Sequence, residues 1–205
     1  MSSMVVVLGS YLLGSVPFSY LVVKLRTGRD VRTVGSGNVG TTNVLRAAGR
    51  AAALLALALD AGKGVAAVLF ARRLAEPPWI VGAAAFAAVL GHVYPVFLGF
   101  RGGKGAATGF GALIALAPPA GVAALGVVAI VLAWTRIVSL GSMIAAALFP
   151  ALTMIAQRLG WVPDRGPWLP LAAAAIAALI LGRHRENLAR LRAGTEPKLG
   201  ERLAP

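Results

Sequence analysis

The 205-residue chain contains no cysteine, only two histidines, and seven acidic residues. Without cysteine, the chain cannot form a disulfide scaffold, a thiolate metal site or a cysteine nucleophile. Two histidines are too few for a histidine-rich metal centre. We therefore expect no bound metal, and the chemistry has to come from other side chains.

Charged residues are also scarce, at 13% against about 25% in soluble domains. Hydrophobic residues make up 58% of the chain, and the mean hydropathy is +0.79. Lys and Arg nevertheless number 20, which gives a formal net charge of +13. A chain that is both apolar and basic is neither disordered nor typical of a soluble nucleic-acid binder. We expect membrane lipid, and no nucleic acid, as its surroundings.

Seven apolar runs predict an all-α polytopic membrane protein, with residues 1–205 forming a single domain. About 20 apolar residues suffice to cross a ~30 Å hydrocarbon layer. One run, Gly105–Ala117, reaches only about 20 Å as a helix. Two arrangements stay open: seven spans, or five spans and a shallow hairpin whose tip is Pro118-Pro119. The runs are Met4–Val23, Ala51–Ala71, Trp79–Leu98, Gly105–Ala117, Pro119–Thr135, Ile137–Ala156 and Pro167–Leu181.

The distribution of basic residues predicts the orientation. Both span counts are odd, so the termini lie on opposite sides of the membrane. With the N-terminus outside, 15 of the basic residues lie on the cytoplasmic side and one, Lys63, within a span. The positive-inside rule therefore favours an external N-terminus and a cytoplasmic C-terminus. Four basic residues remain outside: Arg72, Arg73, Arg158 and Arg165.

Three polar segments interrupt the apolar pattern, and this orientation places all three on the cytoplasmic side. They are Gly35–Arg46, Gly91–Thr108 and His184–Arg190. Each combines glycines, or amide and hydroxyl groups, with a cation, which is how proteins hold anionic oxygens. The segments predict an anionic, phosphorylated substrate. They lack the preceding strand of a dinucleotide fold, the spacing of a Walker loop, and a Gly-x-Ser-x-Gly elbow.

Other polar residues have simpler interpretations. The basic residues between Lys24 and Arg32 favour contact with lipid phosphate, and His92 favours a structural role. Asp60 and Lys63 are three residues apart, so we expect an ion pair that faces the bundle interior. That pair serves either packing or the site. Ser139 and Ser142 share the same spacing, and either line the pocket or bond a backbone carbonyl.

The three polar segments lie within three motifs, which read GSGNVGTTNVLR, GHVYPVFLGFRGGKGAATGFG and HRENLARLRAGTEPK. The segments LDAGKG and RIVSLGSM lie between them. In this order among apolar spans, the chain resembles the bacterial PlsY family of integral-membrane acyl-phosphate:glycerol 3-phosphate acyltransferases. The resemblance covers nearly the whole chain. It implies seven membrane helices and a cytoplasmic site. It also implies acyl transfer from acyl phosphate to the first hydroxyl of glycerol 3-phosphate, with no metal, coenzyme A or other cofactor.

The resemblance also implies roles for particular residues. Ser36, His184 and Asn187 are the expected catalytic residues. Whether His184 or a substrate phosphate accepts the hydroxyl proton stays open, and direct transfer is preferred over an acylated Ser36. The backbone N–H groups of four glycines are expected to bind phosphate with the cations. The expected substrate-binding residues are Gly37, Asn38, Gly40, Thr41, Asn43, Arg46, Gly102, Gly103, Lys104 and Ser142.

The expected setting is the bacterial cytoplasmic (inner) membrane, with glycerol 3-phosphate and acyl phosphate as substrates. An upstream acyl-phosphate synthase and a downstream second acyltransferase are the expected protein partners. The alternative function is a small transporter for organic phosphates. Transporter sites are usually built from structural repeats near the bilayer midplane, whereas these polar segments gather at one face.

Overall fold

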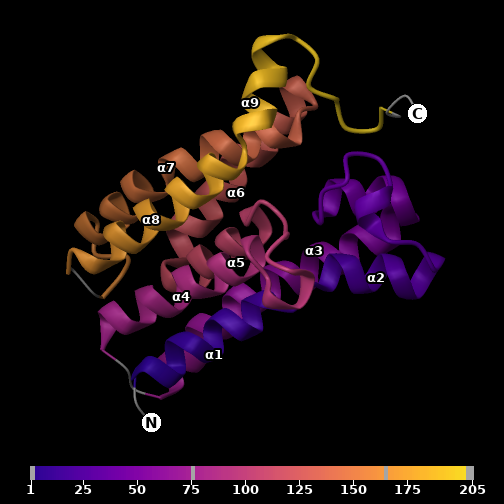
Figure 1. Ribbon diagram of the computed structural model, residues 1–205. Helices are drawn as coiled ribbons and strands as arrows, with labels where there is room; N and C mark the ends of the chain where they lie inside the picture. The colour runs from indigo at the N-terminus through magenta and orange to yellow at the C-terminus, as the bar shows by residue number, and fades with distance from the viewer. Residues whose placement is uncertain (1–2, 75–76, 164–165, 202–205) are drawn as a thin grey trace.

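The computed structural model describes residues 3–74, 77–163 and 166–201 (Figure 1). Within these ranges the chain is helical and contains no strand. Two 3-10 turns, Val31–Thr33 and Val96–Leu98, lie in the connections. Arg165, one of the basic residues predicted to lie outside the membrane, falls outside the described residues. The α-helices are α1 Ser3–Ser15, α2 Phe18–Thr27, α3 Thr41–Arg73, α4 Pro78–Val93, α5 Ala106–Leu116, α6 Pro118–Thr135, α7 Val138–Arg158, α8 Trp168–Arg183 and α9 Arg185–Arg192.

The predicted all-helical membrane fold is confirmed. Two shorter apolar helices, α5 and α8, accompany five helical segments that are long and apolar enough to cross a membrane. Helix α6, which the hairpin arrangement makes one arm of the hairpin, has 18 residues and is one of these five segments. The five long segments are Ser3–Thr27, Thr41–Arg73, Pro78–Leu98, Pro118–Thr135 and Val138–Arg158.

Two of the predicted apolar runs are confirmed as candidate spans but differ in detail from the helices that form them. The first apolar run is not one continuous helix, since α1 ends at Ser15 and α2 begins at Phe18. Pro17 lies between them, has no N–H to donate and clashes with a preceding turn. The second run, Ala51–Ala71, lies in the part of α3 after a break at Gly49, where φ is +83°, and a further helical part that starts at Thr41 precedes the break. The second half of the first polar segment is therefore helical.

Close helix packing brings the segments together. The α1–α4 contact depends on Gly14, where a Cβ atom would lie 2.0 Å from the carbonyl oxygen of Ala88. At the α3–α5 contact, a Cβ atom on Gly64 would lie 2.2 Å from the carbonyl oxygen of Thr108. Small residues that let backbones approach are typical of membrane helix packing. These contacts leave no room for a side chain.

Helix α5 is short but lies within the bundle. It packs against α3, α4, α6 and α8. Its C-terminal end is capped by Arg72, near the end of α3, which donates to the carbonyl oxygens of Ala115 and Leu116 at 2.7 and 3.0 Å. Carbonyl groups at a helix end need such partners, above all where water is absent. The cap shows that α5 ends level with the end of α3.

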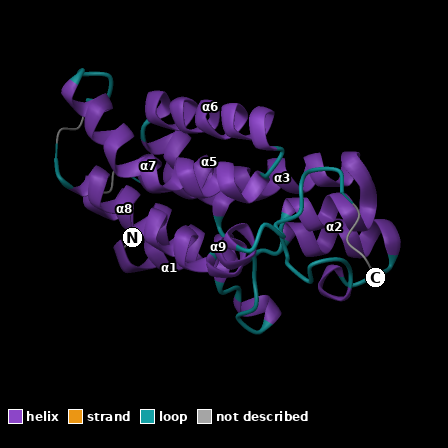
Figure 2. Cartoon of the chain, turned by 90° about the horizontal axis from the view of Figure 1, so that it is seen from above, coloured by secondary structure: helices purple, strands orange, loops and turns teal. Residues whose placement is uncertain are grey.

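The buried hydrophobic residues form two clusters. The larger holds together the main bundle, with residues such as Val89, Leu113 and Phe149. The smaller joins α2, the following loop and the start of α3 around Val23 and Val44. Figure 1 shows the smaller group to the right of the main bundle, and Figure 2 shows loops gathered beside α9. The polar segments of the sequence lie between the two groups.

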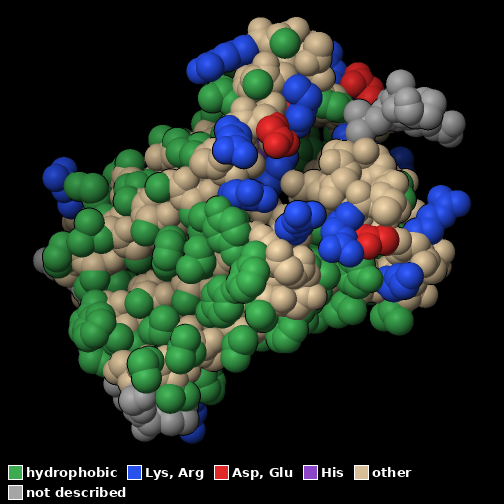
Figure 3. Space-filling model, viewed as in Figure 1, with side chains coloured by type: hydrophobic (Ala, Val, Ile, Leu, Met, Phe, Trp, Pro, Cys, Tyr) green, Lys and Arg blue, Asp and Glu red, His purple; other side chains and the backbone are tan. Residues whose placement is uncertain are grey.

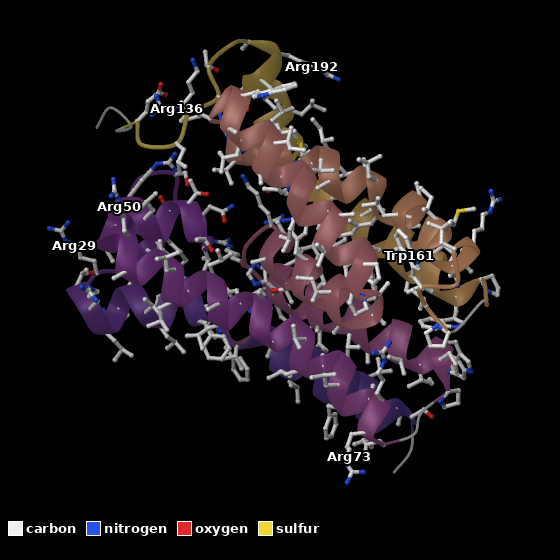
Figure 4. The ribbon with its side chains drawn as sticks, turned by 180° about the vertical axis from the view of Figure 1, so that it is seen from behind. Arg29, Arg50, Arg73, Arg136, Trp161 and Arg192 are labelled. Carbon is white, nitrogen blue, oxygen red and sulfur yellow. The ribbon has the colours of Figure 1, made fainter. Side chains whose placement is uncertain are left out.

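Charge is unevenly distributed over the surface. Figure 3 shows Lys and Arg side chains mainly towards the upper right, above a broad hydrophobic surface. In Figure 4, Arg192 lies at the top, Arg136 at the upper left and Arg50 and Arg29 at the left, whereas Arg73 lies at the lower end. The molecule therefore has one strongly basic end.

Candidate active site

The first polar segment is a loop held by Asn43, which is 2% exposed. Its Oδ1 accepts a hydrogen bond from the Ser36 N–H at 3.0 Å, and its Nδ2 donates to the carbonyl oxygens of Val31 and Val34, both at 2.9 Å. Gly35 has φ +57°, and a Cβ there would lie 2.5 Å from Asn43 Oδ1. Since both amide hydrogens are used, Asn43 shapes the loop and has none left for a substrate.

The remaining loop residues lead into α3. Gly37 has φ +67°, and its N–H donates to the Val34 carbonyl at 3.1 Å. Gly40 is the N-cap of α3, and a Cβ there would lie 3.1 Å from Asn38 Oδ1. Thr41 begins the helix and is half-buried. These residues form the turn that sets the direction of the start of α3 relative to the rest of the site.

Arg46 joins the first segment to the third. It lies one turn into α3 and is half-buried, and a Cβ on Gly35 would lie 3.4 Å from its Cδ. Arg46 interacts electrostatically with Glu196 and Arg190. Ser36 is exposed on the same loop. The structure thus brings Arg46 towards the C-terminal polar residues, as a cation for a shared site.

The second segment folds back on the end of α4. Gly102 N–H donates to the carbonyl of Val93, and Gly103 N–H to that of His92, both at 3.1 Å. A Cβ on Gly103 would lie 2.2 Å from His92 Nε2 and 2.7 Å from the Val39 carbonyl oxygen. Only glycine fits there. The first and second segments are therefore in direct contact.

These backbone bonds correct one prediction. Because the N–H groups of Gly37, Gly102 and Gly103 are already bonded to carbonyl oxygens, the structure does not support their expected role as phosphate donors. Their task is to let the chain approach closely and turn. Gly102 and Gly103 thereby fix the base of Lys104.

A buried ionic cluster supports this loop from below. Asp60, 1% exposed, forms an ion pair with Lys63 at 2.9 Å, accepts from Ser19 Oγ at 2.7 Å, and lies 3.5 Å from His92 Nδ1. Lys63 Nζ also donates to the carbonyl of Val16, in the break between α1 and α2, at 2.9 Å. The expected ion pair is confirmed. The contacts of the ion pair with Ser19 and Val16 give it a packing role. Through His92, the pair also supports the loop of the second segment.

Lys104 joins the second segment to the third. Its Nζ donates to Asn187 Oδ1. Burial lowers the pKa of Lys104, and the nearby charge of Arg190 adds to this effect. A half-buried cation with one neutral partner retains two hydrogens for an anion. Lys104 is thus suited to hold phosphate.

Glu196 organises the third segment. Its carboxylate accepts from Ser139 Oγ at 2.6 Å, Asn187 Nδ2 at 2.5 Å and Arg190 Nε at 2.7 Å. Burial by itself would raise the pKa of Glu196, but these three hydrogen bonds outweigh it and lower the pKa below its usual value. The carboxylate fixes which way the Asn187 amide points, with Oδ1 towards Lys104.

Sequence reasoning missed Glu196 and Arg190. One signal was available, because Glu196 is one of only seven acidic residues and lies in the GTEPK part of the third motif. Ser142 was predicted to line the site. It is buried on α7, but Ser139, one turn earlier, makes the contact with Glu196.

His184 lies at the junction of α8 and α9 and is 3% exposed. Its Nδ1 is 2.8 Å from the carbonyl oxygen of Ile180. A carbonyl only accepts, so Nδ1 carries the hydrogen and Nε2 keeps a free lone pair. Burial lowers the pKa of His184 to about 4, and the charge of Lys104 contributes to this shift. The ring is therefore neutral at pH 7.

The three segments form one polar site with two cations, Arg46 and Lys104, near a neutral imidazole. His184 and Asn187 are three residues apart across the start of α9, as predicted. Within the described ranges, no group of three or more acidic or histidine side chains is arranged to hold a metal ion. The arrangement can bind phosphate oxygens and orient a hydroxyl group.

Comparison with known proteins gives consistent results. The profile of the family described as "Glycerol-3-phosphate acyltransferase" matches residues 4–194. A glycerol-3-phosphate acyltransferase of Jannaschia sp. (strain CCS1) is 50% identical over 192 residues, covering 94% of this chain and 90% of the relative. One from Rubrobacter xylanophilus is 47% identical, covering 98% of each.

Two solved structures are similar to this chain. Both are of PlsY (YgiH), an integral membrane glycerol 3-phosphate acyltransferase. The glycerol 3-phosphate form has a TM-score of 0.86 and 39% identity, covering 98% of this chain and 96% of that one. The lysophosphatidic acid form has a TM-score of 0.84 and 37% identity, with the same coverage.

Proposed function

Because the chain belongs to the glycerol-3-phosphate acyltransferase family, we propose that it transfers a fatty acyl group from an acyl phosphate to the sn-1 hydroxyl of glycerol 3-phosphate. The products are lysophosphatidic acid and inorganic phosphate, at the entry to phospholipid synthesis. The contact between Lys104 and Asn187, with Arg46 directed to the same place, carries the proposal. Two phosphate-bearing substrates repel each other, and the two cations offset that repulsion.

The proposed reaction is a direct displacement. The glycerol hydroxyl oxygen forms a bond to the acyl carbonyl carbon, and the bond from that carbon to the phosphate oxygen breaks. The hydroxyl proton ends on the departing phosphate. An acyl phosphate is a mixed anhydride with a good leaving group, so the protein mainly has to orient the two substrates and exclude water.

Individual residues have proposed tasks in this step. Lys104, Arg46 and Ser36 bind phosphate oxygens, because they supply two cations and an exposed hydroxyl on adjoining segments. Asn187 uses one amide hydrogen on Glu196, and the other is free to stabilise the carbonyl oxyanion. Glu196 is a positioning residue, since it holds Asn187 and Arg190.

We propose that His184 orients the glycerol hydroxyl by accepting its hydrogen bond at Nε2. A pKa of about 4 makes His184 a weaker proton acceptor than a phosphate dianion. His184→Gln and His184→Ala separate the two roles, because Gln accepts a hydrogen bond but no proton. A positioning role predicts that Gln retains about tenfold more turnover than Ala. Equal loss in both variants would make His184 the base.

An acylated Ser36 is not part of this proposal. The Ser36 backbone is tied to Asn43, and among the described residues no histidine or carboxylate hydrogen-bonds its hydroxyl as a base would. Incubation with acyl phosphate alone, followed by mass spectrometry, should leave the mass of the chain unchanged. An acyl adduct on Ser36 would replace direct transfer with a two-step mechanism.

The proposed membrane arrangement has seven crossings, an external N-terminus and a cytoplasmic C-terminus, in the bacterial inner membrane. The cap that Arg72 makes on α5 supports a full crossing by that short helix. The basic end in Figure 4 supports the orientation. Since the chain has no cysteine, Arg73→Cys and Arg192→Cys each give one label site. An impermeant thiol reagent added to intact cells should label only Arg73→Cys; labelling of both or of Arg192→Cys alone contradicts the orientation.

The activity is tested with purified protein in lipid vesicles. Acyl phosphate and glycerol 3-phosphate should yield equal amounts of lysophosphatidic acid and phosphate, whereas acyl coenzyme A in place of acyl phosphate should yield neither. Product from acyl coenzyme A alone would overturn the proposed donor. Uptake of glycerol 3-phosphate without product would indicate a transporter. By chemistry, one enzyme must make the acyl phosphate and a second acyltransferase must consume the lysophosphatidic acid.

A further inference from the structure

A second polar depression lies beside the junction of α8 and α9, and its lining includes none of the proposed catalytic residues. This groove has a volume of about 270 Å³. Ligand pockets commonly span roughly 300–1,000 Å³, so its size suits one headgroup and no larger ligand. It is lined by Tyr94, Ala178, Leu179, Gly182, Arg183 and Arg185, and is called the Tyr94–Arg185 groove below.

The walls of the groove are fixed before any ligand binds. The Tyr94 N–H donates to the Leu90 carbonyl at 2.7 Å, and the Tyr94 carbonyl accepts from the Tyr11 hydroxyl of α1, also at 2.7 Å. Gly182 keeps the groove open, because a Cβ there would meet no atom within 4 Å. The Tyr94–Arg185 groove is therefore preformed.

Two guanidinium groups without carboxylate partners line the groove. The Arg183 guanidinium carbon lies 5.5 Å from the centre of the Tyr94 ring. Its Nε is buried and has no hydrogen-bond partner in the described part of the chain. No ion pair among the described residues involves Arg183 or Arg185. The groove thus offers unpaired positive charge on an aromatic platform.

The groove and the proposed catalytic residues use different residues of the α8–α9 junction. Ile180, His184 and Asn187 are spaced at helical intervals and are buried towards the catalytic site. Ala178, Gly182 and Arg185 are exposed. The groove therefore has its own lining residues, although the charge of Arg183 is near enough to act on Lys104 and His184.

We propose that the Tyr94–Arg185 groove binds the phosphate headgroup of an anionic phospholipid of the bilayer. Guanidinium groups bind phosphate through paired hydrogen bonds, and the apolar walls formed by Ala178 and Leu179 suit the adjoining glycerol. Leu181 and Leu188 beside them are exposed apolar side chains, as expected at a lipid surface. Charge complementarity and this apolar flank favour a lipid over a soluble phosphate. The inference goes beyond the proposed function and does not depend on it.

Filling the groove is the sharpest test. Gly182→Leu places a side chain in the open space, and Gly126→Leu on α6 is the matched control because a Cβ there also meets nothing. Native mass spectrometry of the purified protein with phosphatidylglycerol measures the one-lipid adduct, without any acyl-transfer assay. Gly182→Leu should lower the phosphatidylglycerol adduct about tenfold, and Gly126→Leu should leave it unchanged. Equal adducts in the two variants would overturn the proposal.

Removing the charge tests the chemistry of the ligand. Arg183→Gln combined with Arg185→Gln should lower the phosphatidylglycerol adduct about tenfold and leave the weaker phosphatidylcholine adduct unchanged. Arg192 is an exposed arginine on α9, the helix that also carries Arg185. Arg192→Gln is therefore the control and should leave both lipid adducts unchanged. Equal binding of the two lipids to the unmodified protein would contradict an anion site. Displacement of the lipid by millimolar inorganic phosphate would assign the groove to free phosphate instead.

Discussion

The protein contains two polar clusters that differ in whether their lysine is left free to bind a ligand. Around Asp60, the positive charge of Lys63 and the hydroxyl of Ser19 are used inside the bundle. Around Glu196, the carboxylate is fully engaged, but Lys104 beside it keeps hydrogens to donate. The comparison teaches that the first cluster is suited to hold the fold and the second is suited to meet a ligand.

The two clusters are also linked. The His92 ring contacts Asp60, and the His92 carbonyl oxygen accepts a hydrogen bond from the Gly103 N–H. The cluster around Asp60 therefore positions the loop that ends at Lys104. Lys104 in turn contacts Asn187. These contacts connect the cluster around Asp60, called the closed cluster below, to the cluster around Glu196 and Lys104, called the open cluster. Mutations in the two clusters should therefore differ in their effects on stability and activity.

The largest effect is expected in the closed cluster. Lys63→Met leaves the Asp60 carboxylate buried without its cation, and should lower the free energy of unfolding by about 3–5 kcal/mol. Lys63→Met combined with Asp60→Asn should recover part of the loss, because no unpaired charge remains. Denaturant unfolding in detergent measures both. A double variant less stable than the single one would show that the pair is not what stabilises this cluster.

A mutation in the open cluster should lower the activity of the protein and leave its stability nearly unchanged. Lys104→Ala removes a proposed phosphate ligand and should lower kcat/KM about 10²-fold, with the unfolding midpoint nearly unchanged. Arg101→Ala, an exposed cation three residues earlier, is the matched control and should retain its activity. Initial rates over a range of glycerol 3-phosphate concentrations give the result. If Lys104→Ala unfolds as readily as Lys63→Met, the contrast between the clusters fails.

His184 predicts how stability depends on pH. Its pKa is about 4 when folded and about 6.5 when unfolded. Below pH 6.5 the unfolded chain binds a proton that the folded chain does not, so stability is full above pH 6.5 and is lost as the pH falls towards 4. The loss reaches about 3 kcal/mol at most.

Unfolding midpoints measured from pH 7 to pH 4 test this dependence. His184→Gln should show a shallower decline over that range than the unmodified protein. The same decline in both proteins would mean that His184 titrates alike in the folded and unfolded states.

The smallest effect separates two serines on α7. Ser139→Ala removes one hydrogen bond from the buried Glu196 carboxylate, and should cost about 1–3 kcal/mol of stability and some turnover. Ser142→Ala, one turn further along, should change turnover little. Turnover and thermal unfolding of the two variants are compared directly. A larger loss of turnover in Ser142→Ala would support the sequence prediction that this residue lines the site.

Much of the fold was predictable, because helices in a membrane must be apolar and about 20 residues long. The positions of α3 to α8 follow from apolar runs, although the break at Pro17 and the early start of α3 at Thr41 did not. Residues such as Lys104 and His184 stood out because polar groups are costly beside a membrane. Glu196 did not stand out, since its value comes from side-chain contacts with Asn187, Arg190 and the distant Ser139, which the sequence pattern does not show.

The sequence by itself determined the composition-driven properties of this protein: a chain poor in acid and cysteine, rich in apolar runs, with cations and glycines concentrated in three segments. Periodicity and charge suffice for that, because each is a local property. Only the tertiary structure decided which glycine N–H groups are occupied, that Glu196 orients Asn187, and that the α8–α9 junction carries a basic groove beside the proposed catalytic residues. Those facts depend on contacts between segments up to 83 residues apart, which no local pattern encodes.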